Sequence, residues 1–168
     1  MKEGKSKWRD YLFTEYHLHS AHNFFPQRTV RDERYKLIQN LLPGQINPGY
    51  AFTLNRFFNG LPELIESASP EVQAAYRRME KPPEFELYDL REDPFEFRNL
   101  ALQSEHAETL TRLNRELDSW RESTRDPLLD PENLSLLEKE VNACMVDGKP
   151  SKQDLHWTYP DYFFKLNQ

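Results

Sequence analysis

The sequence predicts an α+β fold in which a small antiparallel sheet of about four strands carries a long carboxyl-terminal helix packed on one face. Two kinds of observation lead to this prediction. Short runs rich in aromatic and β-branched residues occur near the amino terminus and again near residue 85, each bounded by polar turn residues. The chain after residue 100 instead repeats apolar residues at steps of three and four, which is the helical period.

Composition and turns place the strands in chain order. Residues 11–17 suit a first strand, and residues 29–31 and 35–39, separated by a short polar stretch, resemble a hairpin. A further strand covers residues 85–90. It must end before Asp93-Pro94, because proline fixes the backbone and removes a hydrogen-bond donor.

Capping signals mark three helices. Ser69 before Pro70 is typical of a helix start, and Asp130-Pro131 opens another helix that should stop near Gly148. The long helix after Asn99 is the best defined. Its apolar stripe is Ala107, Leu110, Leu113, Leu117 and Trp120. On its exposed side, Glu108 and Arg112 are spaced to pair.

Residues 1–148 are expected to form one domain, with an insertion over residues 41–83 between the hairpin and the strand near residue 85. Residues 149–168 form an aromatic tail without periodicity, which we expect to dock on the body of the protein or on a partner. The single cysteine, Cys144, continues an apolar helical stripe and is expected to be an ordinary buried thiol.

Composition excludes several functions. The 168 residues carry a formal charge of −6, which weighs against a nucleic-acid binder because phosphates favour a strongly basic face. No run of about 18 apolar residues exists, so no membrane span is expected. The amino terminus also lacks the apolar core of a signal peptide.

The most chemical cluster is Glu15-x-His17-x-His19-x-x-His22, followed by Arg28 and Arg31. Alternate strand residues share a face, so Glu15, His17 and His19 could converge as zinc ligands. The same residues could equally form a polar sheet edge. We favour substrate contact by one or two of the histidines, because imidazole donates hydrogen bonds to anionic oxygens and changes charge near neutral pH. The two arginines are candidate anion ligands, with a structural ion pair as the alternative.

Two motifs give a resemblance to a known family. The stretch Glu86-Leu87-Tyr88-Asp89, then Asp93-Pro94 and Asn99-Leu100-Ala101, resembles the carboxyl end of formylglycine-dependent sulfatases. The earlier stretch Pro26-x-Arg28-x-Val30-Arg31, with Arg34-Tyr35-Lys36-Leu37-Ile38-x-Asn40, is similar to a second signature of the same region. Within the insertion, Leu54-Asn55-Arg56 and Gly60 resemble the heparan N-sulfatase group.

The resemblance implies a carboxyl-terminal subdomain whose partners are a sulfatase catalytic core and a sulfated carbohydrate. It implies calcium and formylglycine in that missing core, and no cofactor or catalytic residue in this chain: Cys144 lies outside any Cys-x-Pro-x-Arg motif and no aspartate pair opens the chain. The chain alone is therefore expected to be inactive, and the parent enzyme to be exported or periplasmic. Substrate contacts would come from His19 first, then His17 and His22, with Arg28 and Arg31 as further candidates.

Two other classes of function stay open at this point. A stand-alone carbohydrate-binding module would use exposed tail aromatics such as Trp157, Tyr159 and Tyr162 as stacking platforms. A protein-interaction module would use the same tail to dock on a partner.

Overall fold

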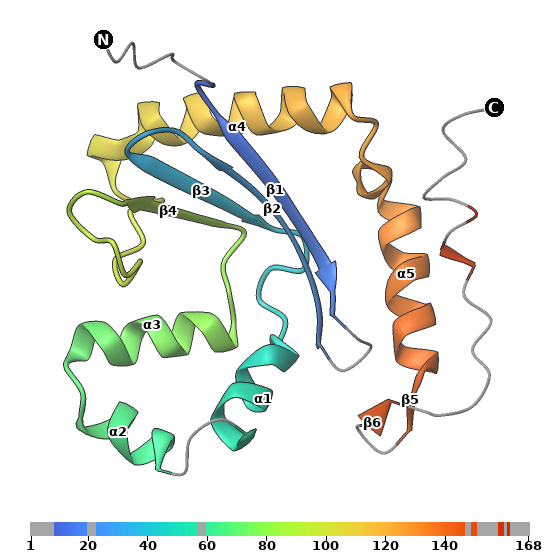
Figure 1. The fold of residues 1–168 in the computed structure, drawn as a ribbon, viewed down its shortest axis with the longest axis horizontal. Helices are drawn as coiled ribbons and strands as arrows, with labels where there is room; N and C mark the ends of the chain where they lie inside the picture. Colours follow the sequence, from blue (N-terminus) through green and yellow to red (C-terminus); the bar gives the residue numbers. More distant parts are fainter. Residues whose placement is uncertain are drawn as a thin grey trace, which may run out of the picture.

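A computed structural model describes residues 9–19, 23–56, 60–146, 149–150, 158–159 and 161, without the side chains of residues 55, 56, 149 and 150. Four strands form one antiparallel sheet in the order β1-β2-β3-β4 (Figure 1). Their bounds are Leu12–Leu18 (β1), Phe24–Arg31 (β2), Tyr35–Asn40 (β3) and Phe85–Asp89 (β4). The α+β fold with about four strands is confirmed.

Strand β2 begins five residues before the predicted start at Thr29, because it continues through Pro26. The pairing of β1 with β2 is irregular between Tyr16 and Leu18, next to the Tyr16–Gln27 pair. Proline cannot donate to a strand ladder and is tolerated at such an irregularity. The antiparallel order brings the β1–β2 loop and the insertion after β3 to the same end of the sheet.

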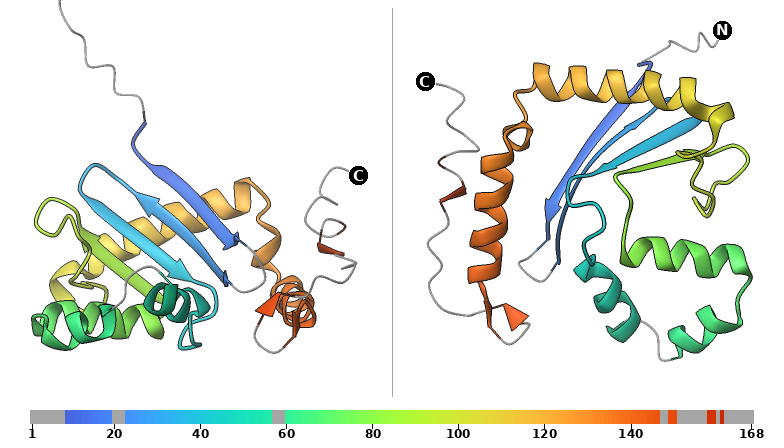
Figure 2. Two further views of the ribbon diagram at one scale, coloured as in Figure 1. Left: turned by 60° about the horizontal axis from the view of Figure 1, so that its bottom comes forward. Right: turned by 180° about the vertical axis from the view of Figure 1, so that it is seen from behind.

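The insertion is ordered by its own helices, which are α1 (Pro48–Arg56), α2 (Leu61–Ser67) and α3 (Pro70–Glu80). The predicted cap of α3 is confirmed, since the Ser69 hydroxyl accepts a hydrogen bond from the Val72 amide at 3.4 Å. Helices α1 and α3 lie on the opposite side of the sheet from the long helix α4 (Ala107–Ser123) (Figures 1 and 2). The predicted packing of the long helix on one face of the sheet is confirmed, and the insertion helices add a second helical layer on the opposite side.

Helix α4, preceded by the short 3-10 turn η2 (Ser104–His106), packs four of the five residues of its predicted apolar stripe against the sheet, whereas the first, Ala107, is exposed. Its central leucines join one core residue from each of the strands β2, β3 and β4, and all five are fully buried: Val30, Leu37, Leu87, Leu113 and Leu117. The predicted Glu108–Arg112 pair is wrong. Arg112 instead forms an ion pair with Asp32 at 2.7 Å, because the β2–β3 turn lies beside the helix.

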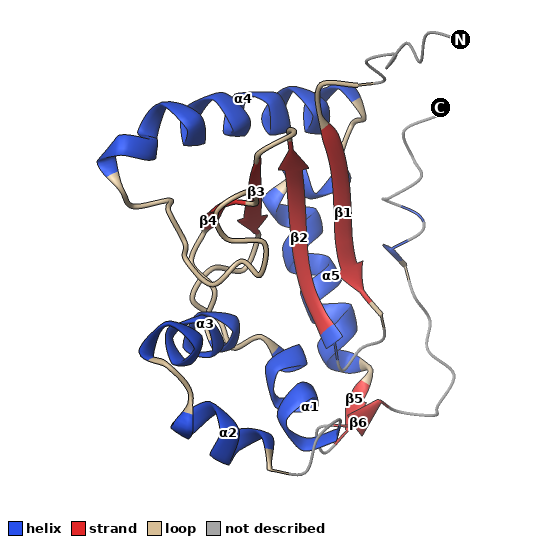
Figure 3. Ribbon diagram, turned by 60° about the vertical axis from the view of Figure 1, so that its left-hand side comes forward, coloured by secondary structure: helices blue, strands red, loops and turns tan. Residues whose placement is uncertain are grey.

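A second core covers the end of the sheet at which β2 begins. The 3-10 turn η3 (Pro127–Leu129) and helix α5 (Pro131–Ala143) supply Leu128, Leu137 and Val141, which pack with Phe24, Phe25 and Leu42. Figure 3 shows α5 behind β2. The prediction for Cys144 is confirmed: the thiol is buried beside Glu140, and burial raises its pKa.

The carboxyl-terminal tail is described only in part. Strands β5 (Met145–Val146) and β6 (Lys149–Pro150) pair after α5, which ends at Ala143, and Gly148 lies outside the described residues. Further along, the Thr158 amide donates to Glu140 at 2.9 Å, and Tyr159 packs against the second core. Trp157 and Tyr162 lie outside the described residues, so docking of the tail as a whole stays a prediction. In the part of the chain that the structure describes, no helix has the length and apolar character needed to cross a membrane.

The Asn99-Leu100-Ala101 motif has a clear structural task, which is to satisfy the outer edge of β4. The Asn99 carboxamide accepts from the Leu87 amide at 2.9 Å and donates to the Phe85 carbonyl at 3.1 Å. The Leu100 amide then donates to the Leu87 carbonyl at 2.8 Å. The chain after β4 therefore takes the place of a neighbouring strand at this edge.

Candidate functional site

His19 lies where β1 has just ended, at the end of the sheet shared with the insertion. Its side chain is exposed, so it is accessible to a ligand. His22, in the following loop, lies outside the described residues. Among the predicted histidines that the structure describes, His19 is the one with an exposed side chain at this end of the sheet.

His17 is partly buried on the α4 side of the sheet. Alternate residues of β1 share a face, and on one face these are Phe13, Glu15 and His17. This face is turned toward α4, because the ring of Phe13 stacks on Trp120 of α4 with centroids 5.3 Å apart. Burial lowers the pKa of His17, and the charge of Arg28 lowers it further, against weaker opposing effects of Glu15 and Asp126. A neutral imidazole at neutral pH follows from this environment.

Arg28 is fully buried and engaged in a carboxylate pair. Its Nε and Nη2 donate to the two carboxylate oxygens of Asp126 at 2.7 and 2.6 Å, and its Nη1 donates to the Gln27 carbonyl at 3.0 Å. Arg121 of α4 donates from its Nε to the same carboxylate at 2.7 Å. We call Arg28, Arg121 and Asp126 the buried ion cluster.

The buried ion cluster favours the structural alternative for Arg28 over anion binding, because the guanidinium has no exposed surface. Its closest partner, Asp126, is 98 residues away in sequence, and a longer contact of 3.9 Å joins its Nε to the Glu15 carboxylate on the neighbouring strand β1. Burial alone would raise the pKa of Asp126, but the hydrogen bonds and charge of Arg28, followed by Arg121, outweigh burial and hold this pKa below its usual value. Asp126 was not predicted as a partner of Arg28, because nothing local in the sequence reveals a contact over 98 residues.

Arg31 lies at the opposite end of the sheet from His19. It pairs with Leu12 in the register, whereas Leu18 pairs with Phe24 at the other end of β1. Six residue steps along a strand span about 20 Å. The structure therefore does not bring Arg31 together with the histidines.

The described residues offer no metal site of the type considered from the sequence, because no group of three or more His, Cys, Asp or Glu side chains is arranged there to hold an ion. The zinc alternative for Glu15, His17 and His19 thus has no geometric support in this part of the chain.

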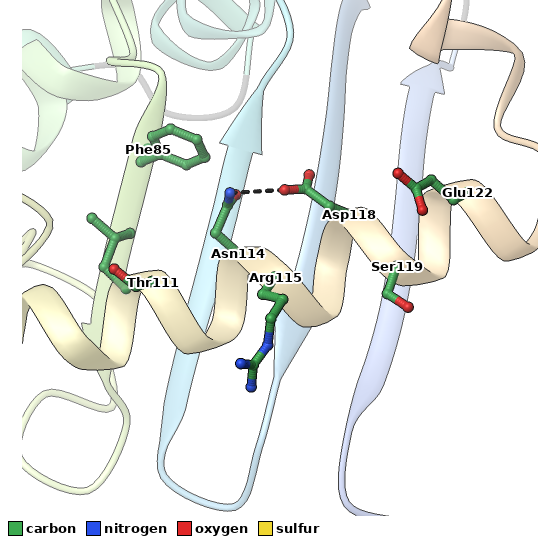
Figure 4. Close-up of a pocket in the computed structure, with 8 residues that line it drawn as sticks. Phe85, Thr111, Asn114, Arg115, Asp118, Ser119 and Glu122 are labelled. Atoms are coloured by element: carbon green, nitrogen blue, oxygen red, sulfur yellow. Dashed lines mark hydrogen bonds between the residues drawn. The ribbon is translucent and has the colours of Figure 1, made fainter.

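A hollow of about 490 Å³ lies along α4 (Figure 4). Asn114 and Asp118 lie on the side of α4 that faces the ends of β1 and β3, and their side chains hydrogen-bond at 2.9 Å. The charged residues that line the hollow are Arg115, Asp118 and Glu122. Two carboxylates against one guanidinium are unsuited to a sulfate group, so we do not assign the predicted anion contact to this hollow.

Comparisons with known proteins agree on one group. An ulvan-active sulfatase of Formosa agariphila is 35% identical over 141 residues, covering 77% of this chain and 22% of the relative. A second ulvan-active sulfatase of that organism is 32% identical over 62% of this chain and 19% of its own length. Human N-sulphoglucosamine sulphohydrolase is 28% identical over 84% of this chain and 28% of its own length. The chain therefore spans about a fifth to a quarter of these relatives, and no protein-family model matches it.

Solved structures show a weaker likeness. A putative sulfatase from Bacteroides thetaiotaomicron matches with a TM-score of 0.44 at 22% identity, over 74% of this chain and 18% of its own. A 2-O GAG sulfatase matches with a TM-score of 0.46 at 19% identity, over 90% and 24%. At these values the structural likeness adds nothing to the sequence matches.

Proposed function

Because this chain belongs to the sulfatase family, we propose that it is the carboxyl-terminal part of a sulfatase that acts on sulfated sugars, and that it positions the substrate. Three observations support the proposal. The sequence matches reach relatives whose names specify ulvan and N-sulphoglucosamine as substrates. The two sequence motifs resemble the carboxyl end of the family, and the chain corresponds to 22% and 28% of the length of these two relatives.

The chemical step is proposed to belong to a catalytic core outside this chain. Sulfatases of this family use formylglycine and calcium, and the residues described here do not fit either group. Cys144 is buried and donates from its Sγ to the Glu140 carbonyl at 3.0 Å. The residues that follow it do not form the Cys-x-Pro-x-Arg motif in which the cysteine is converted to formylglycine. The core is thus the proposed partner of this chain, and a sulfated sugar is the proposed ligand of the two together.

His19 is the proposed contact to the substrate, and its exposed position at the end of β1 is the observation that carries this assignment. A half-buried His17 and the unplaced His22 remain candidates beside it. Arg28 and Arg31 rank lower, since Arg28 is held in the buried ion cluster and Arg31 lies at the other end of the sheet. Arg28 then serves to fix the strand that carries the loop.

The assignment is tested with His19→Ala in the parent sulfatase. Loss of a hydrogen bond to a charged group should lower kcat/KM for the natural sulfated sugar by about ten- to a hundredfold, while a small aryl sulfate, which has no sugar to contact, is turned over as before. His106→Ala is the matched control, because His106 packs on Tyr35 near the opposite end of the sheet. An equal fall for both substrates, or no fall, would remove His19 from the site.

The division of labour is tested separately. The purified chain should show no turnover of aryl or sugar sulfates, with or without added calcium, because the nucleophile and the cation ligands are expected elsewhere. Turnover that copurifies with this chain through several columns would overturn the division proposed here.

A further inference from the structure

A groove lies on the face of the sheet that is turned away from α4. It consists of two adjoining pockets of about 380 and 330 Å³, which share the residues Gln27, Asn47 and Met79. Residues of strands β1 to β4 and of the insertion helices α1 and α3 line the two pockets. Its first pocket is lined by Tyr16 and Asn23, which flank the loop next to His19.

Carboxamides converge in this first pocket. Asn23, Gln27 and Asn47 all line it, together with the aromatic rings of Tyr16, Phe25 and Phe52. The Nε2 of Gln27 also donates to Oδ1 of Asn40 at 2.6 Å, which fixes this carboxamide in the pocket. A carboxamide offers both donors and acceptors without charge, which suits the hydroxyl groups of a sugar. Aromatic walls suit the apolar faces of a sugar ring.

The arrangement of these carboxamides depends on a glycine. A Cβ atom at Gly49 would stand 2.8 Å from Oδ1 of Asn23 and 3.1 Å from Oδ1 of Asn47. Asn47 is further fixed because its Oδ1 accepts from the Gly49 amide at 2.9 Å. The Asn47-Pro48-Gly49 turn therefore lets two carboxamides approach the start of α1 closely.

The charged side chains that line the second pocket are already paired. Arg78 lies 3.3 Å from the Glu86 carboxylate and donates to the Phe97 carbonyl at 2.8 Å. Glu96 is held by Lys36 at 2.7 Å. With these charges satisfied, the groove is suited to an uncharged ligand and not to a sulfate.

The far end of the groove carries an aromatic pair. Phe95 is 75% exposed and stacks on Phe97, with ring centroids 5.9 Å apart. The groove thus begins with carboxamides beside the His19 loop and ends at an exposed aromatic surface.

We propose that this groove binds uncharged sugar units of the same glycan whose sulfated unit is contacted at His19, with Asn23, Gln27 and Asn47 as hydrogen-bonding residues. The inference rests on the proposed function, because that function supplies the glycan. It adds a subsite for the unsulfated part of the glycan. This subsite lies on the opposite face of the sheet from the buried ion cluster.

The test is an NMR titration of the full ¹⁵N-labelled chain with two probes. One probe is a neutral tetrasaccharide of N-acetylglucosamine, and the other is the same tetrasaccharide carrying sulfate groups. The neutral probe should shift the side-chain amide signals of Asn23, Gln27 and Asn47 in a saturable way. Asn23→Ala should raise its Kd by about three- to tenfold, as expected for one lost hydrogen bond.

Gln103→Ala is the matched control, because Gln103 is an exposed carboxamide next to η2 and does not line the groove. Gly49→Ala should weaken binding in the same way by displacing Asn23. If neither probe shifts the carboxamide signals, or if the Asn23 and Gln103 variants have equal Kd values, the proposal that the groove binds a sugar is wrong.

The two proposals fail separately. If the sulfated probe shifts the ring signals of His19 and neither probe shifts the carboxamide signals, the proposed sugar binding in the groove is wrong and the proposed contact at His19 stands. If the neutral probe shifts the carboxamide signals and the sulfated probe does not shift the signals of His19, the proposed sugar binding in the groove stands and the proposed contact at His19 is wrong.

Discussion

Asp126→Asn should destabilise the fold strongly, because one carboxylate holds two buried guanidinium groups. Its Oδ1 accepts from Arg28 Nη2 at 2.6 Å and from the Leu128 amide at 3.0 Å, and its Oδ2 accepts from the Nε atoms of Arg28 and Arg121, each at 2.7 Å. Whichever way an asparagine is turned, its amide group faces two donors. The cheaper orientation loses the hydrogen bonds from Arg28 Nη2 and from the Leu128 amide, one from a charged donor and one from a neutral donor. This loss costs about 2 to 4.5 kcal/mol, in line with about 3 to 5 kcal/mol for breaking a buried ion pair.

Urea denaturation of the purified chain measures this loss. Asp130→Asn is the matched control, because Asp130 is an exposed cap of α5 and asparagine caps a helix equally well, so its loss should stay below about 0.5 kcal/mol. Arg28→Met should cost less than Asp126→Asn, since Asp126 keeps Arg121 as a partner. Similar unfolding free energies for the Asp126 and Asp130 variants would refute the structural role of the buried ion cluster.

Three further predictions address the core, the sheet edge and the pH dependence. Leu113→Ala should cost about 2 to 5 kcal/mol in a denaturant titration, against well under 1 kcal/mol for the exposed Arg115→Ala, and equal losses would contradict the assigned helix face. Asn99→Ala should cost about 1 to 3 kcal/mol by leaving the β4 edge unsatisfied, with faster amide exchange at Leu87 as its readout. Because the pKa of His17 is lowered in the folded chain, the unfolded chain binds a proton at His17 first as the pH falls. The contribution of the neutral His17 imidazole to stability is therefore complete above about pH 6.5 and is lost as the pH falls through the lower folded pKa. His17→Gln should flatten the decrease in unfolding free energy as the pH falls below about 6.5, and an unchanged slope would contradict this assignment.

The sequence by itself determined the local elements. The period of three and four in Ala107–Ser123 fixed which residues of α4 face the sheet, and Ser69 and Asp130 marked helix starts that the structure confirms. These features depend on neighbours within one turn, so they can be predicted from the order of residues alone. The same holds for the burial of Cys144, which continues an apolar stripe.

Tertiary structure alone decided which charged side chains are available. Arg28 and Arg31 look equivalent in the sequence, yet one is fully buried against Asp126 and the other is exposed at the far end of the sheet from His19. The convergence of Asn23, Gln27 and Asn47 likewise requires the insertion to fold back over the sheet. Contacts between residues 20 to 98 positions apart are set by how helices and strands pack together, and no periodic pattern in the sequence encodes that packing.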